Sequence, residues 1–118
     1  MAKACGKEDT KMIENAKYFH DATKLIADNI IENQFAIYVK RIDELVEDRK
    51  NAGIFRADIK IDSATYSQNK TIAKKLKSYY KNKGFKFKIK DLGDPYSGIY
   101  VIIDWKKPKI LEIITNYD

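Results

Sequence analysis

The hydrophobic pattern of the chain changes its period at Gly53, and this change limits the possible folds more than any other feature. Before Gly53, apolar residues recur at steps of three and four, which is typical of amphipathic helices. After it, residues 54–62 alternate apolar and polar side chains, which is typical of a strand with one buried face. Gly53 suits a helix end, because glycine adopts the left-handed backbone conformation without steric cost.

The helical part, about residues 8–52, carries two apolar stripes. The first consists of Met12, Ala16, Phe19, Thr23, Ile26 and Ile30. The second consists of Phe35, Tyr38, Ile42, Leu45, Val46 and Arg49. The polar residues 28–34 between them either separate two helices or kink a single one. We favour two helices.

The part after the glycine, residues 54–118, predicts a β-α-β-β order. The expected elements are a strand at 54–62, a helix at 68–83 capped by Ser67, strands at 85–90 and 99–105, and a short helix or an edge strand after Pro108. The strand at 99–105 is the most apolar and is expected to be central. Three strands cannot bury both faces of a sheet by themselves, so helices must pack on it.

The fold class that follows is α+β. We expect one two-layer domain over residues 1–118, in which the N-terminal helices pack on a small, mainly antiparallel sheet of three strands. The expected order of elements is α-α-β-α-β-β-α. The predicted core joins the helix residues Phe19 and Ile42 to Ile72, Leu76, Phe87, Ile89, Val101 and Ile103.

Composition limits the compartment and the class of protein. A chain of 118 residues with 44% hydrophobic and 34% charged residues is typical of one globular domain. No apolar run approaches the ~20 residues that span a bilayer, and residues 1–9 lack a signal peptide's apolar core. The single cysteine, Cys5, has no internal partner, which fits a reducing compartment. We expect a cytoplasmic protein without a membrane partner.

Positive charge is concentrated in the second half of the chain. Residues 1–62 hold eleven basic and twelve acidic residues, whereas residues 63–118 hold twelve basic and five acidic ones. Between Asp62 and Asp91 there are nine lysines and no acid, which codon bias toward lysine does not explain. Such a one-signed segment attracts and steers anionic partners.

The predicted basic face has a helical and a strand part. The helical part, with steps of four and three, consists of Lys70, Lys74, Lys77 and Lys81. The strand part consists of Lys86, Lys88 and Lys90. An acidic protein surface, a nucleic-acid backbone and plain solvation are the open interpretations. The chain has only three arginines, which disfavours base-specific readout.

An acidic patch on the second predicted helix offers a counterpart within the chain or in another copy. It consists of Asp43, Glu44, Glu47 and Asp48. A contact between this patch and the lysines of another copy would allow self-association. The competing interpretation is scattered, solvated charge.

Aromatic residues are interleaved with the lysines. They are Tyr66, Tyr79, Tyr80, Phe85 and Phe87. Stacking on single-stranded bases needs exposed rings, whereas most of these positions fall on the apolar faces. We therefore expect core packing, with Tyr79 as the candidate exception.

One catalytic interpretation was weighed. The run that ends in Asp104-Trp-Lys106 resembles the Asp-x-Lys motif of metal-dependent nucleases of the restriction-endonuclease type, where an acid binds Mg²⁺. Asp58-Ile-Lys60 repeats the spacing, and Asp94 lies upstream. However, no second acid is expected on an adjoining strand, and the order of elements differs. The lone His20 has no zinc-binding pattern around it. We expect no catalytic residues, no metal and no cofactor.

A second resemblance covers about a third of the chain. The segment Leu76-x-x-Tyr79-Tyr80-x-x-x-Gly84-Phe85-x-Phe87, followed by Tyr100-Val-Ile-Ile-Asp104-Trp105, resembles small bacteriophage-encoded structural and accessory proteins. In those, a helix leads through Gly-Phe into a hairpin that ends in a tryptophan strand. The resemblance transfers no functional residue. It implies a non-enzymatic assembly or accessory protein, in the host cytoplasm or the virion.

Overall fold

A computed structural model of the protein describes residues 2–93 and 98–108, with side chains from residue 15 onward. The chain divides into two compact units, Met1–Ile30 and Ile31–Asp118. Each unit is described by itself below. The element expected after Pro108 lies outside the described residues.

Helix α1 runs without interruption over Ala2–Asn51, so the predicted break at residues 28–34 is wrong. Five of those seven residues are polar, but none is proline or glycine, and polar side chains alone leave the backbone hydrogen bonds of a helix intact. The predicted end is confirmed, because Gly53 has a φ of 74°. There the amide of Ile54 donates to the carbonyl of Arg49 at 2.8 Å, which closes the last turn.

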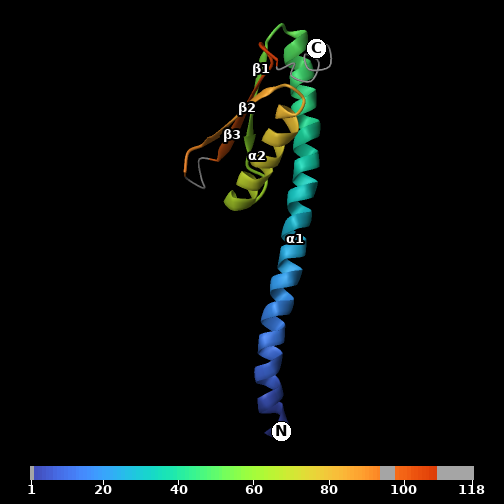
Figure 1. The fold of residues 1–118 in the computed structure, drawn as a ribbon, viewed down its shortest axis with the longest axis vertical. Helices are drawn as coiled ribbons and strands as arrows, with labels where there is room; N and C mark the ends of the chain where they lie inside the picture. Colours follow the sequence, from blue (N-terminus) through green and yellow to red (C-terminus); the bar gives the residue numbers. More distant parts are fainter. Residues whose placement is uncertain (1, 94–97, 109–118) are drawn as a thin grey trace, which may run out of the picture. The chain divides into compact units, whose positions relative to one another are not determined.

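The second unit holds a three-stranded sheet (Figure 1). Its strands are β1 (Arg56–Ile61), β2 (Lys86–Asp91) and β3 (Ile99–Asp104), in the order β1-β3-β2. Both outer strands pair antiparallel with β3, so the prediction of a central third strand is confirmed. Since β1 and β2 run parallel to each other, a crossover must join them, and α2 (Tyr66–Lys81) supplies it. The predicted α+β class is thereby confirmed.

Helix α2 begins with a capping box at Thr65, two residues before the predicted cap Ser67. The Thr65 hydroxyl accepts a hydrogen bond from the amide of Gln68 at 3.3 Å, and the Gln68 side chain accepts one from the amide of Thr65 at 3.2 Å. The buried Asn69 adds two more hydrogen bonds at the start of the helix. Its side-chain oxygen accepts from the backbone N–H of Ala64, and its side-chain NH₂ donates to the carbonyl of Ala64. These contacts start the helix earlier than its apolar stripe indicates.

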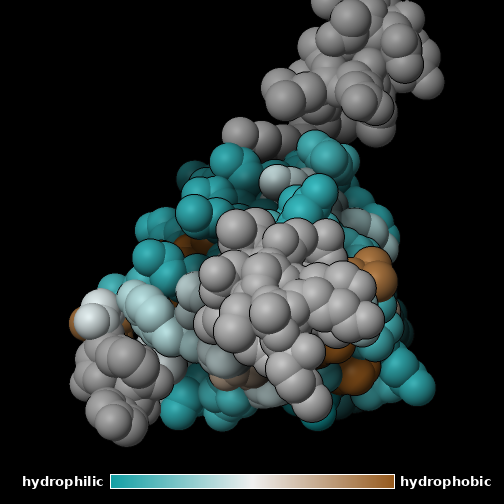
Figure 2. All heavy atoms as spheres, turned by 90° about the horizontal axis from the view of Figure 1, so that it is seen from below, coloured by the Kyte–Doolittle hydropathy of each residue, from teal (hydrophilic) through white to brown (hydrophobic). Residues whose placement is uncertain are grey.

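The core lies between the sheet, α2 and residues 31–51 of α1. It consists of Tyr38, Ile42, Ile61, Ile72, Ala73, Leu76, Tyr80, Phe87, Ile99, Val101 and Ile103. Of the predicted core, only Phe19 is wrong, since it is 62% exposed, while Ile89 is partly buried against the cluster. On the face drawn in Figure 2 the described residues are mostly hydrophilic, as expected when apolar side chains gather inside. None of the described helices is long and apolar enough to cross a membrane.

Tyr80 connects all three parts of this core. Its ring stacks on Phe87 of β2, with the ring planes 11° apart and the centroids 6.0 Å apart. Its hydroxyl donates to the carboxylate of Asp43 at 2.8 Å and lies 3.2 Å from the carbonyl of Val39, both on α1. Burial raises the pKa of the Tyr80 phenol, and the hydrogen bond to Asp43 raises it further, so the hydroxyl keeps its proton.

The prediction that the aromatic residues pack in the core is confirmed. Tyr80 and Phe87 are buried, and Tyr66, Tyr79 and Phe85 are partly buried. The candidate exception, Tyr79, lies edge-on against both Phe35 and Tyr80. None of the five therefore offers an open ring face for stacking on bases.

We expect Leu76→Ala to lower the free energy of unfolding by about 2–5 kcal/mol, the usual cost of deleting a buried leucine side chain. Leu76 is fully buried in the cluster, so a cavity would remain. Urea denaturation measures the change. The control is Leu92→Ala, because Leu92 is 53% exposed. A loss below about 0.5 kcal/mol for Leu76→Ala, the usual range for surface changes, would contradict the packing of α2.

We expect Tyr80→Phe to lower the free energy of unfolding by about 1 kcal/mol, because the variant keeps the ring but loses the hydrogen bonds to α1. Tyr100→Phe is the matched control, since Tyr100 is exposed and no hydrogen bond of its hydroxyl is found among the described residues. Equal urea midpoints for the two variants would show that the Tyr80 hydroxyl does not hold α1.

Candidate anion-binding face

Within the second unit, α2 and residues 31–51 of α1 pack on one face of the sheet, and no described element of that unit covers the other face. Side chains alternate along a strand, so each strand contributes three of them to this outer face. The pairing register arranges the nine residues in three rows: Arg56–Asp104–Lys86, Asp58–Ile102–Lys88 and Lys60–Tyr100–Lys90. These nine residues are called the outer face below.

The structure divides the predicted basic face into two sets. Lys86, Lys88 and Lys90 all belong to the outer face and are exposed. The helical lysines sit on α2, which packs on the inner face through its own buried stripe. The strand lysines and the helical lysines therefore do not share one face.

The helical lysines are partly engaged within the chain. The ammonium of Lys70 lies 3.7 Å from the carboxylate of Asp91, and Lys77 is half-buried. The neighbouring Lys75, outside the predicted set, pairs with Glu32 of α1. Lys74 and Lys81 are exposed, and no ion pair of theirs is found among the described residues. The helical set is thus the weaker candidate for binding a partner.

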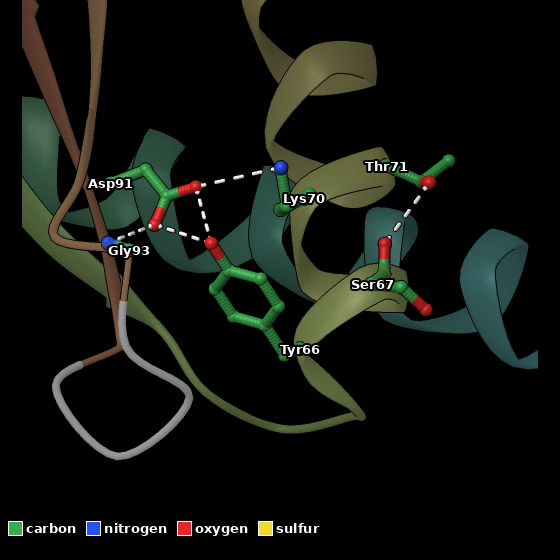
Figure 3. Close-up of polar contacts among 6 residues, drawn as sticks. All are labelled: Tyr66, Ser67, Lys70, Thr71, Asp91 and Gly93. Atoms are coloured by element: carbon green, nitrogen blue, oxygen red, sulfur yellow. Dashed lines mark hydrogen bonds and ion pairs between the residues drawn. The ribbon is translucent and has the colours of Figure 1, made fainter.

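The contact of Lys70 belongs to a cluster that fastens the end of β2 to the start of α2 (Figure 3). The hydroxyl of Tyr66 lies 2.7 and 2.8 Å from the two carboxylate oxygens of Asp91. The amide of Gly93 donates to the same carboxylate at 2.9 Å. The hydrogen bond from Tyr66, then that from Gly93 and the charge of Lys70, hold the pKa of Asp91 below its ordinary value.

The outer face carries five cations and two carboxylates. Arg56 and Asp58 form a bidentate pair, with nitrogen–oxygen distances of 3.0 and 3.3 Å, and the hydrogen bond to Asp58 raises the pKa of Arg56. This pair nearly cancels its own charge. Within the described part of the chain, Lys86, Lys88 and Lys90 form no ion pair, so their charge is available to a partner.

Apolar side chains lie at the centre of the same face. Tyr100 is 36% exposed and Ile102 is half-buried, and both stand on the central strand. The ammonium of Lys60 lies 6.0 Å from the centroid of the Tyr100 ring. Two shallow hollows, of about 260 and 210 Å³, both border Arg56 and Ile102. The face thus combines an apolar centre with a cationic edge along β2.

The predicted acidic patch is exposed on α1, but the structure does not bring it to the lysines. All four of its residues, Asp43, Glu44, Glu47 and Asp48, are exposed. Asp43 accepts the Tyr80 hydroxyl, and Glu47 pairs with Lys50 on its own helix. Among the described residues, no ion pair joins the patch to the predicted basic face. Pairing of the patch with the basic face, within the chain or between copies, therefore stays a prediction.

The Asp-x-Lys motifs do not form a metal site in the described part of the chain. The expectation of no second acid on an adjoining strand is wrong, since Asp58 and Asp104 stand on neighbouring strands of the outer face, but Asp58 is held by Arg56. The carboxylate of Asp104 accepts a hydrogen bond from the backbone amide of Lys106 at 2.8 Å. Asp94 lies outside the described residues, and no group of three potential metal ligands occurs within them.

Three members of the outer face are not candidate site residues in the sequence analysis: Arg56, Tyr100 and Ile102. The alternation of β1 already indicated that Arg56 and Lys60 point away from the core. Tyr100 and Ile102 were hidden because the third strand reads as apolar throughout. Applying the same period of two to that strand would have separated them from Val101 and Ile103.

No protein-family model, no curated protein and no solved structure matches the chain. The function must therefore be argued from the outer face itself.

We expect Asp91→Asn to destabilise the protein at neutral pH but not in strong acid. Folding lowers the pKa of the Asp91 carboxyl. The ionised carboxylate therefore stabilises the folded state at any pH above its ordinary pKa of 3.8. That contribution is lost as the pH falls from 3.8 through the lower pKa of the folded state. Urea midpoints measured at pH 7 and well below pH 3.8 test this.

Asp28→Asn is the control for that experiment. Asp28 is an exposed carboxylate on α1, and no side-chain contact of it is found among the described residues. Its replacement should leave the pH dependence of the urea midpoint unchanged. An Asp91→Asn profile that runs parallel to the wild-type profile at every pH would refute the proposed stabilisation.

Proposed function

We propose that the protein is a non-enzymatic binding or assembly component whose outer face docks on an acidic protein surface. The observation that carries the proposal is the row of exposed lysines along β2, beside Tyr100 and Ile102 on the central strand. No described element of the second unit covers this face.

The composition of the face supports a protein partner over a nucleic acid. Protein interfaces combine an apolar centre with a polar rim, which is the arrangement of Tyr100 and Ile102 beside the lysines. A track for single-stranded nucleic acid needs several open aromatic rings, and the outer face holds one.

The lysines would act mainly on the rate of encounter. Exposed charge at the edge of an interface steers a partner of opposite sign and contributes less to the packing of the final complex. Such steering weakens with added salt, because the Debye length falls to about 8 Å at physiological ionic strength. The apolar centre would supply the part of the affinity that is independent of salt.

The assembly role follows from the resemblance to small bacteriophage proteins. That part stays a prediction, because it depends on a pattern that carries no functional residue. The outer face would serve a virion component and a host-directed accessory protein equally well.

The test is a pair of matched double variants. Lys88→Glu/Lys90→Glu reverses two lysines of the outer face and avoids Lys86, which stands opposite Asp104. Lys74→Glu/Lys81→Glu reverses two exposed lysines of α2 and changes the net charge equally. Binding of a labelled polyglutamate peptide is measured by fluorescence anisotropy. The first variant should bind the peptide at least about tenfold more weakly than the wild type, a loss of about 1.4 kcal/mol in binding free energy. The second variant should bind like the wild type.

Three outcomes would contradict the proposal. Equal losses in both variants would mean that net charge alone matters. The absence of peptide binding even at low salt would remove the acidic partner. Binding of a labelled thymidine oligonucleotide but not of the peptide would establish the nucleic-acid alternative. Circular dichroism of each variant checks that the fold is kept.

A further inference from the structure

The apolar stripe on the first unit is not packed in the described structure, although it was predicted to face a core. Its large side chains are open to solvent: Phe19 is 62% exposed, Ile26 59% and Ile30 38%. Isolated helices are marginal in water, and most helices owe their stability to packing of the apolar face. The stripe therefore calls for a partner from outside its own helix.

The spacing of the stripe identifies the kind of partner. Its residues follow steps of three and four from Ala16 to Ile30, and Met12 stands four residues before Ala16 in the sequence. Strict alternation of three and four is the seam of a coiled coil, in which the apolar residues of one helix meet those of another. A face buried on a globular core is usually broader.

The surface along the stripe is hollowed in the way that coiled-coil packing requires. A shallow hollow of about 400 Å³ is lined by Ala16, Phe19, His20, Thr23, Lys24 and Ala27. The first four stand at positions i, i+3, i+4 and i+7, which is the set of four residues that forms a hole in knobs-into-holes packing. The small side chains of Ala16 and Thr23 leave room in this hole. Phe19 also serves as the knob that packs into the corresponding hole of the partner helix.

Charge permits this partner to be a second copy. The charged residues of this segment, Lys17, Asp21, Lys24 and Asp28, cancel each other. The positions beside the seam hold Asn15, His20, Ala22, Ala27 and Asn29, so two copies would bring no like charges together at neutral pH. Two copies of the basic second half would repel each other, whereas two copies of this segment would not.

We propose that residues 15–30 of α1 form an antiparallel two-stranded coiled coil with the same residues of a second copy. When Phe19 faces Thr23 of the second copy, Ala16 faces Ile26. Large side chains then oppose small ones in each of the four layers between positions 16 and 26, which fills space evenly. A parallel pairing sets Phe19 against Phe19 and Ala16 against Ala16, and so alternates crowded layers with empty ones. The antiparallel pair has two-fold symmetry.

The first test measures the mass of the full chain in solution. Analytical ultracentrifugation from about 5 to 500 µM should show a monomer–dimer equilibrium. Phe19→Ala/Ile26→Ala should raise the dissociation constant at least about tenfold. The control Tyr18→Ala/Leu25→Ala removes side chains of nearly equal exposure, 65% and 64%, that lie off the stripe. Its dissociation constant should stay within about twofold of the wild-type value. That change in binding free energy is well under the roughly 1.4 kcal/mol of a tenfold loss.

The second test fixes the orientation. The variants Ala16→Cys and Ile26→Cys are prepared separately in a Cys5→Ser background, and one of them carries a tag. Each variant is oxidised with glutathione disulfide by itself, and a mixture of the two is oxidised in the same way. Only facing positions come close enough for a disulfide. We expect the mixed product between positions 16 and 26, and little product from Ala16→Cys alone.

Several results would overturn the inference. A monomer over the whole concentration range would exclude self-association through the stripe. Equal weakening by both double variants would place the contact elsewhere. Efficient cross-linking of Ala16→Cys alone would show a parallel pair. These results do not depend on the outer face, so the Lys88→Glu/Lys90→Glu variant should dimerise normally.

Discussion

The second unit depends on one buried side chain, Tyr80 of α2, which contacts both α1 and β2. Its ring supports β2 through Phe87, and its hydroxyl holds α1 through Asp43 and Val39. A buried hydroxyl must keep a partner or lose free energy, so the ring can stay in the core only while α1 lies along α2. This requirement ties residues 31–51 of α1 to the helical layer.

Once both helices occupy one side, the other side of the sheet is left open. The crossover from β1 to β2 places α2 on the inner face, and β3 enters between the two parallel strands. The polar residues of each strand must then share the remaining face with Tyr100 and Ile102. The outer face is thus a consequence of the topology, and the lysine row on β2 gives that exposed face its positive charge.

The sequence predicted local structure well, because the periods of two and 3.6 belong to the chain itself. It identified the strands, the helix stop at Gly53 and most of the core. It could not determine which side of the sheet α2 would cover, so it could not separate Lys88 from Lys74. Phe19 shows the same limit, since an apolar stripe reveals that a helix needs a partner without revealing which one. The cap at Thr65 could have been predicted, because Thr65-x-x-Gln68 has the capping-box spacing, but the apolar stripe pointed to Ser67 instead.

The two proposed surfaces differ in the force that drives them, and this difference separates them experimentally. Steering by Lys88 and Lys90 weakens as salt screens their charge. The stripe around Phe19 and Ile26 buries apolar area between segments of zero net charge, so salt should leave its association unchanged or strengthen it. If a second copy binds through α1, each dimer also presents two outer faces to an acidic assembly. Two linked sites then bind more tightly than one without any new contact, provided that the partner repeats its acidic surface at a matching distance.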